Sequence, residues 1–363
     1  MKNQLYKWFE HERRVLPWRE TQDPYAIWIS EIILQQTRVE QGLPYYLQFI
    51  ERFPDVRTLA AASEDEVLRY WQGLGYYSRA RNLHRAAQEI MTKHNGCFPR
   101  TFDEIRSLPG IGDYTAGAIA AFAYNLPYPA LDGNVYRVLA RLSDCEIPFD
   151  TSAGKKHFRQ LAESLLDPDN PRLFDSAVME FGALYCVPQN PDCEHCPLAL
   201  HCLAYAHNTV SLLPVRKAKP QIRDRWFEYA IYLAPAPEGG VQTLIHQRRA
   251  DDIWKHLWEF PLTETTQDAF ILNQCKSRQS SKSGKRNPAS SNSRTKASAQ
   301  KNNQENYSFE LTHILSHQRI HARFTIYKVP ALPKIADTRI VNLRDLDEFA
   351  FSRLTLKAAL SIT

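Results

Sequence analysis

The feature that most constrains this chain is a change of hydrophobic period at about residue 205. Before that point apolar residues recur every three to four positions, as in PYAIWISEIILQQTRVEQGLPYYLQFIERF, which predicts amphipathic helices. After it, WFEYAIYLAP with GGVQTLIHQRR, and FELTHILSHQ with IHARFTIYKV, predict two pairs of strands. We therefore expect a helical region over 1–205, a linker over 206–224 and a smaller α/β domain over 225–363.

Local signals divide the helical region further. Thr58, Ser63 and Thr101 are typical of helix starts, because their side-chain oxygens can cap a first turn. Helix breaks are predicted at Pro44, Pro54, Pro99 and Pro109.

The net charge of +5 is a poor guide to partners, because the charge is unevenly distributed. Residues 1–222 carry 24 Lys and Arg against 26 Asp and Glu, whereas residues 276–304 hold eight basic residues and no acidic one. This Ser-, Lys- and Asn-rich tract lacks the apolar side chains of a core, so we expect a disordered basic insertion over about 276–306.

The chain has no run of eighteen apolar residues, which predicts that no helix spans a membrane. Its start, MKNQLYKWFEHERRVLPWRE, is typical of an amphipathic helix and not of a signal peptide. We expect a cytoplasmic protein.

Four of the seven cysteines fall within seventeen residues: Cys186, Cys193, Cys196 and Cys202. Secreted disulfide scaffolds are shorter and more evenly studded, so this cluster predicts a metal site in a reducing compartment. Four thiolates can bind zinc or a [4Fe–4S] cluster. Zinc sites more often contain two Cys-x2-Cys pairs, and the single pair here favours [4Fe–4S].

The stretch LPGIGDYTAGAIAAF predicts a tight turn between helices. In a helix–hairpin–helix, Gly110 and Gly112 would adopt backbone angles that other residues avoid. The N–H groups that open the next helix would then face outward and, with the helix dipole, bind a DNA phosphate without reading sequence. An ordinary tight helix connection is the alternative.

Asp132 lies twenty residues after Gly112, at the head of the helical stretch NVYRVLARL. Its carboxylate could simply cap that helix. However, a helix–hairpin–helix followed at this distance by an aspartate resembles the pattern of a DNA glycosylase superfamily. In that superfamily the carboxylate faces the extruded nucleotide.

Glu31 lies among apolar residues in WISEIILQQTRVEQ, with Ile27 four positions before it and Leu34 three after it. Apolar surroundings disfavour the ionised carboxylate and raise its pKa, and a neutral Glu near pH 7 can act as a general acid. A surface Glu at the edge of the helix is the alternative. With Asp132 it would form a pair, one group protonating a leaving base and the other stabilising an oxocarbenium-like sugar.

Five stretches and the four cysteines together resemble the MutY adenine DNA glycosylase family: SEIILQQTRVE, GLGYYSRARNL, LPGIGDYTAGAI and LDGNVYRVLARL, with HLWEFPL in the C-terminal domain. The resemblance implies a six-helix module over about 26–130, an iron–sulfur module from 1–25 plus 131–205, and a Nudix-like C-terminal domain. It implies a monomeric, nucleoid-associated enzyme that flips adenine out of double-stranded DNA and removes it opposite 8-oxoguanine or guanine.

The same resemblance carries roles onto this sequence. Glu31 would protonate N7 of adenine, and Asp132 would stabilise the sugar cation or bond to it transiently. Further pocket and DNA contacts would come from Tyr114, Asn134, Trp18, Arg19, Glu180, Gln36 and Tyr76. For Trp18 a core position, and for Glu180 a helix-face position, is the alternative.

Position 114 distinguishes two related classes. Endonuclease III-like enzymes have a lysine there, which forms a Schiff base with the sugar and permits strand cleavage. Tyr114 cannot do this, so a monofunctional glycosylase is expected. An endonuclease III-like pyrimidine glycosylase/lyase and a catalytically inactive iron–sulfur DNA-binding protein are the alternatives.

The C-terminal domain of the family contacts 8-oxoguanine through a Phe-Ser-His loop, which Leu315, Ser316 and His317 match here. Leucine in place of the aromatic residue implies weaker stacking. The glutamate-rich helix that binds metal in a nucleotide hydrolase is missing from this sequence. We therefore expect the C-terminal domain to recognise 8-oxoguanine and not to hydrolyse nucleotides. The basic tract over 276–304 would attract phosphate loosely or be a tolerated insertion.

A last pattern is YYSRARNLHR, in which Arg79, Arg81 and His84 stand near Tyr76 and Tyr77. Cations beside aromatic residues are typical of a DNA-facing loop. A solvated helix face is the alternative.

Overall fold

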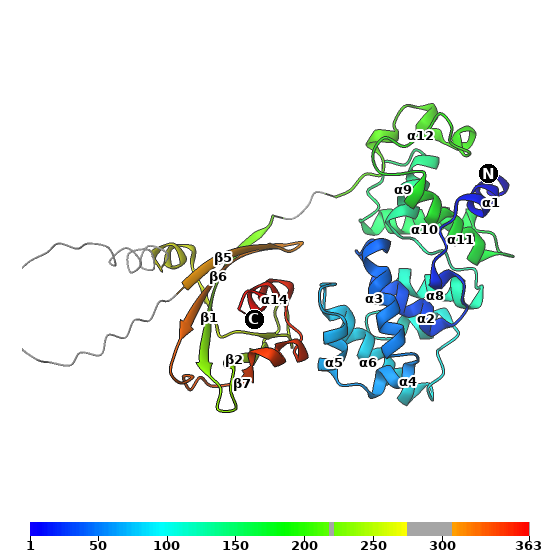
Figure 1. Ribbon diagram of the computed structural model, residues 1–363. Helices are drawn as coiled ribbons and strands as arrows, with labels where there is room; N and C mark the ends of the chain where they lie inside the picture. Colours follow the sequence, from blue (N-terminus) through cyan, green and yellow to red (C-terminus); the bar gives the residue numbers. More distant parts are fainter. Residues whose placement is uncertain (218–220, 274–306, 363) are drawn as a thin grey trace, which may run out of the picture. The chain divides into compact units, whose positions relative to one another are not determined.

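A computed structural model describes residues 1–217, 221–273 and 307–362. The chain forms two compact units (Figure 1): Met1–Tyr70 with Ser78–Lys219, and Trp71–Tyr77 with Pro220–Thr363. The first unit is helical and the second is built on a sheet. The insertion expected over 276–306 lies outside the described residues.

The helical unit follows the predicted periodicity. Its α-helices are α1 (Lys2–Glu12), α2 (Pro24–Leu34), α3 (Val39–Arg52), α4 (Val56–Ala61), α5 (Glu64–Tyr70), α6 (Ser78–Lys93), α7 (Phe102–Ser107), α8 (Asp113–Tyr124), α9 (Gly133–Leu142), α10 (Ser152–Leu165), α11 (Pro171–Leu184) and α12 (Leu203–Ala206). The 3-10 turns η1 (Pro17–Arg19), η2 (Ala199–His201) and η3 (Val210–Leu212) connect them.

Side-chain caps fix where several helices begin. Asp23 and Asp132 accept hydrogen bonds from first-turn N–H groups of α2 and α9. Thr101 and Glu104 form a reciprocal capping box on α7, as the predicted start at Thr101 required.

Two boundary predictions are wrong. Thr58 does not start a helix, because Asp55 takes the cap position of α4 and accepts the Thr58 N–H at 2.7 Å. Pro44 does not end one, because it lies inside α3. The buried Tyr46 and Phe49 on the same helix provide the packing that outweighs the hydrogen bond a proline cannot donate.

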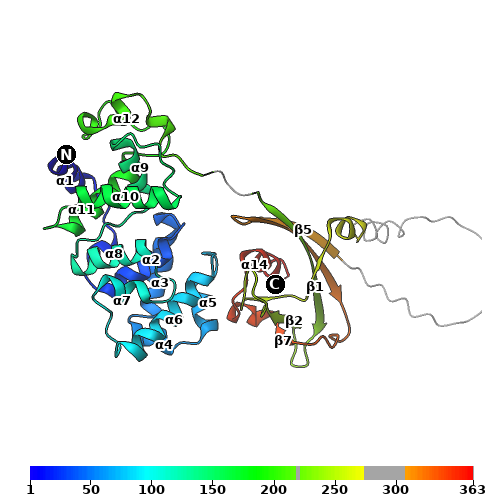
Figure 2. The same ribbon diagram turned by 180° about the vertical axis from the view of Figure 1, so that it is seen from behind.

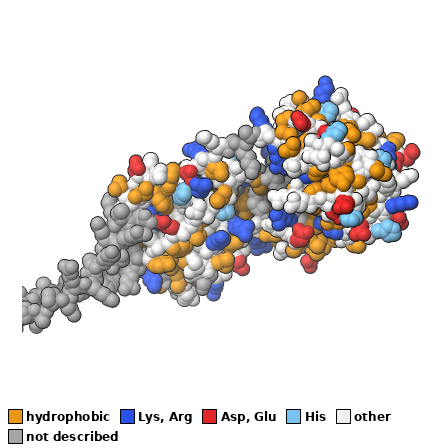
Figure 3. All heavy atoms as spheres, turned by 90° about the horizontal axis from the view of Figure 1, so that it is seen from above, with side chains coloured by type: hydrophobic (Ala, Val, Ile, Leu, Met, Phe, Trp, Pro, Cys, Tyr) orange, Lys and Arg blue, Asp and Glu red, His pale blue; other side chains and the backbone are white. Residues whose placement is uncertain are grey.

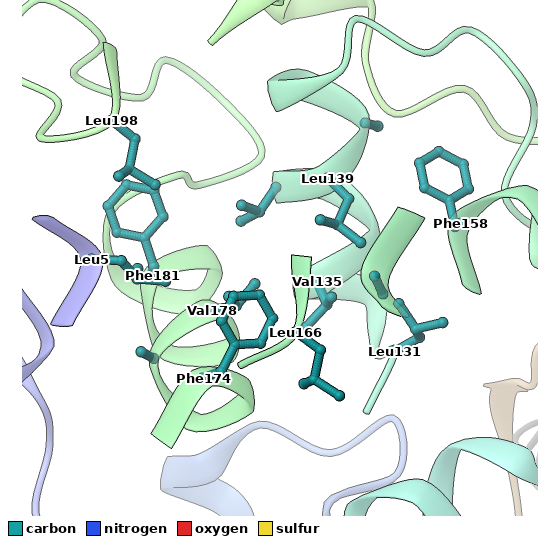
Figure 4. Close-up of a cluster of buried hydrophobic side chains, with 14 of the residues drawn as sticks. Leu5, Leu131, Val135, Leu139, Phe158, Leu166, Phe174, Val178, Phe181 and Leu198 are labelled. Carbon is teal, nitrogen blue, oxygen red and sulfur yellow. The ribbon is translucent and has the colours of Figure 1, made fainter. Parts of the chain in front are cut away.

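An apolar core joins the first helix to the later helices of this unit (Figure 4). Leu5 of α1, Leu139 of α9, Phe158 of α10 and Phe181 of α11 converge there, and each is at most 2% exposed. Because the core fixes α9 against α11, it also fixes Asp132, which caps the start of α9.

The second unit contains one sheet with strands in the order β3-β2-β1-β6-β5, to which β4 and β7 add through β1 and β2. Its elements are β1 (Arg223–Pro235), β2 (Val241–Gln247), β3 (Trp258–Glu259), β4 (Leu262–Thr265), β5 (Tyr307–Ile314), β6 (Gln318–Lys328), β7 (Thr338–Asn342), η4 (Leu343–Glu348) and α14 (Arg353–Leu360). The pairing of β5 with β6 is antiparallel, and that of β1 with β6 is parallel.

Strand alternation gives this sheet its buried face. Phe227, Tyr229 and Ile231 of β1 are buried at every second position, as a half-buried strand requires. Leu354 and Ala358 of α14 pack into the same cluster, and Figure 2 shows α14 beside the sheet. The predicted helical part followed by a smaller α/β part is therefore confirmed. Among the described residues, no helix has the length and apolar character needed to cross a membrane.

Replacing Leu139 by Ala should lower the free energy of unfolding by about 2–5 kcal/mol, because the cavity left in a packed core adds to the lost apolar burial. Leu200, which is 92% exposed, gives a matched control expected to change stability by less than about 0.5 kcal/mol. Urea unfolding of both variants provides the measurement. Equal effects would contradict the assignment of this core.

Candidate active site

Glu31 lies on a helix that is buried almost all round. Residues 27–33 of α2 are all buried, and Glu31 itself is 7% exposed. The hydroxyl of Ser30 is satisfied within the helix by the Ile27 carbonyl at 2.7 Å. A buried ionised carboxylate is strongly disfavoured unless it is paired, so the state of Glu31 depends on its partners.

Tyr114 of α8 is the nearest polar partner of this acid. Its hydroxyl donates to Oε2 of Glu31 at 2.7 Å. Burial is the main cause that raises the pKa of Glu31, the Tyr114 hydrogen bond and Arg19 oppose it, the charge of Asp132 adds to it, and the resulting pKa is about 7. Near neutral pH, Glu31 can therefore carry a proton and release it to a bound base.

Asp132 is both a helix cap and part of this site. Its Oδ1 accepts the N–H groups of Asn134 at 2.9 Å and Val135 at 2.7 Å, and its Oδ2 accepts the Asn134 side-chain amide at 2.7 Å. Burial raises the pKa of Asp132, and these three hydrogen bonds oppose that rise. The two hypotheses for Asp132 from sequence, a helix cap and a carboxylate of the site, are therefore compatible.

One cavity of about 490 Å³ brings most of the predicted site residues together. It is lined by Glu31 and Asp132 along with Trp18, Arg19, Gln36, Tyr114, Asn134 and Glu180. These side chains come from η1, from α2 and the loop that follows it, from α8, from the start of α9 and from α11, which lie far apart in the sequence (Figure 1). The arrangement can hold a planar, uncharged ligand between an acid and an anion.

Glu180 has the opposite electrostatic setting to Glu31. It is fully buried, and although burial raises its pKa, hydrogen bonds from Arg14 and Arg19 outweigh this and lower the pKa to about 2. Arg14 donates through its N–H, Nε and a terminal nitrogen at 2.8–2.9 Å, and Arg19 donates at 2.8 Å. Sequence reasoning missed Arg14, because nothing local connects it to α11.

The four clustered cysteines line a second, smaller cavity. Arg141 donates to Sγ of Cys186 at 3.3 Å, and the Leu198 N–H approaches Sγ of Cys196 at 3.4 Å. Such N–H donors are typical of thiolate sulfur in iron–sulfur sites. Within the described residues, no three His, Cys, Asp or Glu side chains are arranged to hold a single metal ion.

A buried arginine connects this loop with the first cavity. Arg137 donates through Nε to the Cys186 carbonyl at 2.7 Å and through a terminal nitrogen to Oδ1 of Asn134 at 3.0 Å. Asn134 in turn donates to Asp132. Arg137 and Arg141 were not foreseen as site residues, because an arginine on a helix face gives no local signal of burial.

The predicted hairpin lies between α7 and α8. Gly110 has φ +78°, and a Cβ there would lie 2.6 Å from Cβ of Asn82, so only glycine fits. The same expectation for Gly112 is wrong: it caps α8 with φ −97°, an extended conformation open to any residue. What Gly112 provides instead is an exposed helix start without a side chain.

Two of the predicted DNA contacts share an unusual backbone conformation. Gln36 and Tyr76 have φ of +55° and +48°, the left-handed region, and both are exposed. Such outliers for side-chain-bearing residues concentrate at functional sites. Ser316 and His317 are exposed in the β5–β6 turn, and within the second unit the Ser316 hydroxyl hydrogen-bonds to that of Tyr76.

The expectation of a DNA-facing loop at Arg79 and His84 is wrong for these two side chains. Arg79 donates to the carbonyls of Ile32, Ile33 and Gln35 at 2.6–3.1 Å and so closes the end of α2. His84 is 5% exposed and lies within 3.3 Å of Gln88.

Comparison with protein families agrees with both units. Residues 29–167 match the HhH-GPD superfamily of base excision DNA repair proteins, and residues 237–360 match the NUDIX domain. The first match spans Glu31, the hairpin and Asp132.

Curated relatives are more specific. The adenine DNA glycosylase of Buchnera aphidicola subsp. Baizongia pistaciae is 39% identical over 264 residues, which cover 71% of this chain and 72% of that protein. The mouse adenine DNA glycosylase is 34% identical, with 72% of this chain and 60% of the mouse protein covered. The chain belongs to the adenine DNA glycosylase family. It is therefore a DNA N-glycosylase of base excision repair.

Solved structures support the fold of this glycosylase. A thermostable thymine-DNA glycosylase is 28% identical with a TM-score of 0.51, and covers 56% of this chain and 94% of its own. A trapped endonuclease III–DNA covalent intermediate, at 24% identity and a TM-score of 0.50, shares the fold. On the face drawn in Figure 3, cationic, acidic and apolar side chains of this glycosylase are intermixed, as its near-balanced charge implies.

Replacing Tyr114 by Phe should move the alkaline limb of adenine excision to higher pH. The hydroxyl stabilises the ionised form of Glu31, so its removal raises the pKa of Glu31 above about 7 and keeps the acid protonated longer. Single-turnover excision rates across pH provide the measurement. Tyr124→Phe, at the far end of α8, is the control, and a limb that stays in place or moves down would contradict the role of Tyr114.

Proposed function

We propose that this glycosylase is monofunctional and hydrolyses the N-glycosidic bond of adenine mispaired with 8-oxoguanine or guanine, after the adenine is flipped out of double-stranded DNA. The observation that carries the proposal is the single cavity that holds a buried, protonatable Glu31 and a hydrogen-bonded Asp132. Hydrolysis of a purine N-glycoside needs an acid for the base and an anion for the sugar, which these two groups supply.

Glu31 acts as the general acid in this proposal. Its proton passes to N7 of adenine, the bond between C1′ and N9 breaks, and the base leaves with the bonding electrons. Water then adds to C1′ and its proton returns to the ionised Glu31. The pKa near 7 supports this assignment, because the acid must be protonated at working pH and yet strong enough to give up the proton.

Asp132 stabilises the electron-poor sugar or bonds to it transiently. Three hydrogen bonds to its carboxylate favour the ionised form that this role requires. Asn134 fixes the orientation of that carboxylate through its side-chain amide. Positive charge that develops on the sugar would therefore meet an anion held in place beforehand.

Adenine recognition is proposed for Trp18, Arg19 and Glu180, which line the same cavity as Glu31 and Asp132. Arg19 and Glu180 supply hydrogen-bonding groups there, and Trp18 supplies an apolar face. Trp18 is 8% exposed and meets Tyr46 edge to face at 5.1 Å, so it is part of the packing and of the cavity wall alike.

Contacts with the DNA beyond the flipped adenine are proposed for exposed groups. Gln36 and Tyr76 would enter the base stack, for which their exposed, left-handed positions are suited. Gly110 and Gly112 would bring the start of α8 to a phosphate. Ser316 and His317 would contact the opposite base, and Leu315 in place of an aromatic residue implies weaker stacking on it.

The four cysteines are proposed to hold a [4Fe–4S] cluster. Their shared cavity and the N–H donors beside Cys186 and Cys196 fit thiolate ligands. Such a group would supply a covalent tie between the loop and its flanking helices. A monomeric enzyme in the cytoplasm, associated with the nucleoid, completes the proposal, with the domain boundaries given from sequence.

Glu31→Gln should reduce single-turnover excision of adenine opposite 8-oxoguanine by at least about 100-fold, because the amide cannot donate an acidic proton. Binding of the mispair should change little. Duplexes pairing adenine with 8-oxoguanine, guanine or cytosine, and duplexes with thymine glycol, form the substrate panel. Near-normal cutting by the variant would overturn the acid assignment.

Two other outcomes of this panel separate the alternatives. Excision of thymine glycol together with a borohydride-trapped covalent product would favour an endonuclease III-like glycosylase/lyase. Tight mispair binding without release of adenine by the unaltered chain would favour an inactive iron–sulfur DNA-binding protein.

Purified protein is expected to contain about four iron atoms and as much acid-labile sulfide per chain. Cys193→Ala should lower both and reduce stability, whereas Cys97→Ala, at an exposed cysteine outside the cluster, should leave both unchanged. Stoichiometric zinc without iron would contradict the cluster assignment.

A further inference from the structure

Another buried carboxyl near the catalytic pair, besides that of Glu180, has no role in the mechanism above. Asp175 of α11 is 2% exposed and lies five residues before Glu180 on the same helix. Buried carboxyls are uncommon unless they are paired or functional, so its partners need an explanation.

Asp175 contacts the chain just before Asp132. Its Oδ2 accepts the N–H of Ala130 at 3.2 Å. The same segment is held by close packing on both sides: a Cβ on Gly117 would lie 2.9 Å from the carbonyl oxygen of Pro129, and one on Gly182 would lie 2.7 Å from Cβ of Asn134. The backbone that carries Asp132 is thus clamped between α8 and α11, and Asp175 provides the polar part of the clamp.

The hydrogen bonds favour a negative charge on Asp132 over one on Asp175. Asp132 accepts three of them, and Asp175 accepts the one from Ala130. Burial, with a smaller contribution from the charge of Asp132, raises the pKa of Asp175 to about 8, against the opposing effect of the Ala130 hydrogen bond. Two neighbouring buried carboxyls do not both ionise readily, so the negative charge resides on the one that accepts more hydrogen bonds, which is Asp132.

The ionisable groups of other elements that interact electrostatically with Asp175 agree with this division. They are Asp132 at the start of α9, Tyr114 of α8 and Tyr6 of α1, an anion and two phenols. The cationic Arg14, which follows α1, and Arg19 of η1 are engaged with Glu180, which lies farther along α11.

We propose that Asp175 is a positioning residue whose uncharged carboxyl fixes the Ala130–Asp132 segment and leaves the single negative charge of the pair on Asp132. This inference rests on the proposed role of Asp132. Asp175 contacts no reacting atom: it holds the backbone that carries the anion and adds no competing charge beside it.

Two substitutions separate the hydrogen bond from the charge. Asp175→Asn keeps an oxygen that accepts the Ala130 N–H and is neutral at every pH, so single-turnover excision at pH 7 should stay within about threefold of the unaltered chain. Asp175→Leu removes the acceptor and frees the segment, so excision should fall by roughly 100-fold while the dissociation constant for mispaired DNA changes little. Rescue by the amide distinguishes positioning from a need for negative charge.

Thermal unfolding tests the uncharged state without any reference to catalysis. Because the pKa of Asp175 lies above its ordinary value of 3.8 in the folded protein, stability from this group is lost as pH rises toward about 8. Asn has no such loss, so the midpoint of Asp175→Asn minus that of the unaltered chain should increase steadily between about pH 5 and pH 8. Asp169→Asn, at an exposed aspartate in the loop before α11, is the matched control and should give a flat difference.

Each result decides the proposal. A flat difference for Asp175→Asn, or an excision loss as large as that of Asp175→Leu, would show that the carboxyl is ionised and overturn it. Normal excision by Asp175→Leu would overturn the positioning role. If the proposed function is wrong, the unaltered chain will not excise adenine. The thermal unfolding result does not depend on excision and still tests the uncharged state of Asp175.

Discussion

The burial of one carboxyl group in α2 is the constraint on which the rest of the site depends. Residues 27–33 of α2 are all buried, so Glu31 cannot turn toward water. Its polar contact is the Tyr114 hydroxyl, which requires α8 to pack beside α2 in one register. Arg79 then closes the end of α2 by donating to the carbonyls of Ile32, Ile33 and Gln35, which fixes the helix that carries the acid and the turn that follows it.

Around that acid the cavity holds carboxyls in different electrostatic settings. Glu31 has a phenol and apolar walls and keeps its proton near neutral pH. Glu180 has two arginines and is ionised throughout the working range. Asp132 has three hydrogen bonds from the start of its own helix. The residue type is nearly constant and the neighbours differ, so the division of tasks comes from packing and not from composition.

Local chemistry decided what the sequence could predict. The apolar neighbours of Glu31, the turn at Gly110 and the cysteine spacing are short-range patterns, and the change from helices to strands follows from period alone. The partners of these groups were not predictable, because Arg14, Arg137 and Asp175 reach them across long separations in sequence. Errors have the same origin: His84 looks like a loop cation in sequence, yet it is buried on α6.

One helix explains why packing and chemistry are hard to separate here. On α11, Phe174 and Phe181 enter the apolar core, while Glu180 lines the cavity that contains Glu31 and Gly182 lets the start of α9 approach. A shift of this helix in the core would therefore move this wall of the cavity and the segment that carries Asp132 together. Since interiors are packed too densely to absorb such a shift locally, geometry at the site is inherited from the core. A substitution in the core face of α11 should thus change the rate of excision even when the protein remains folded.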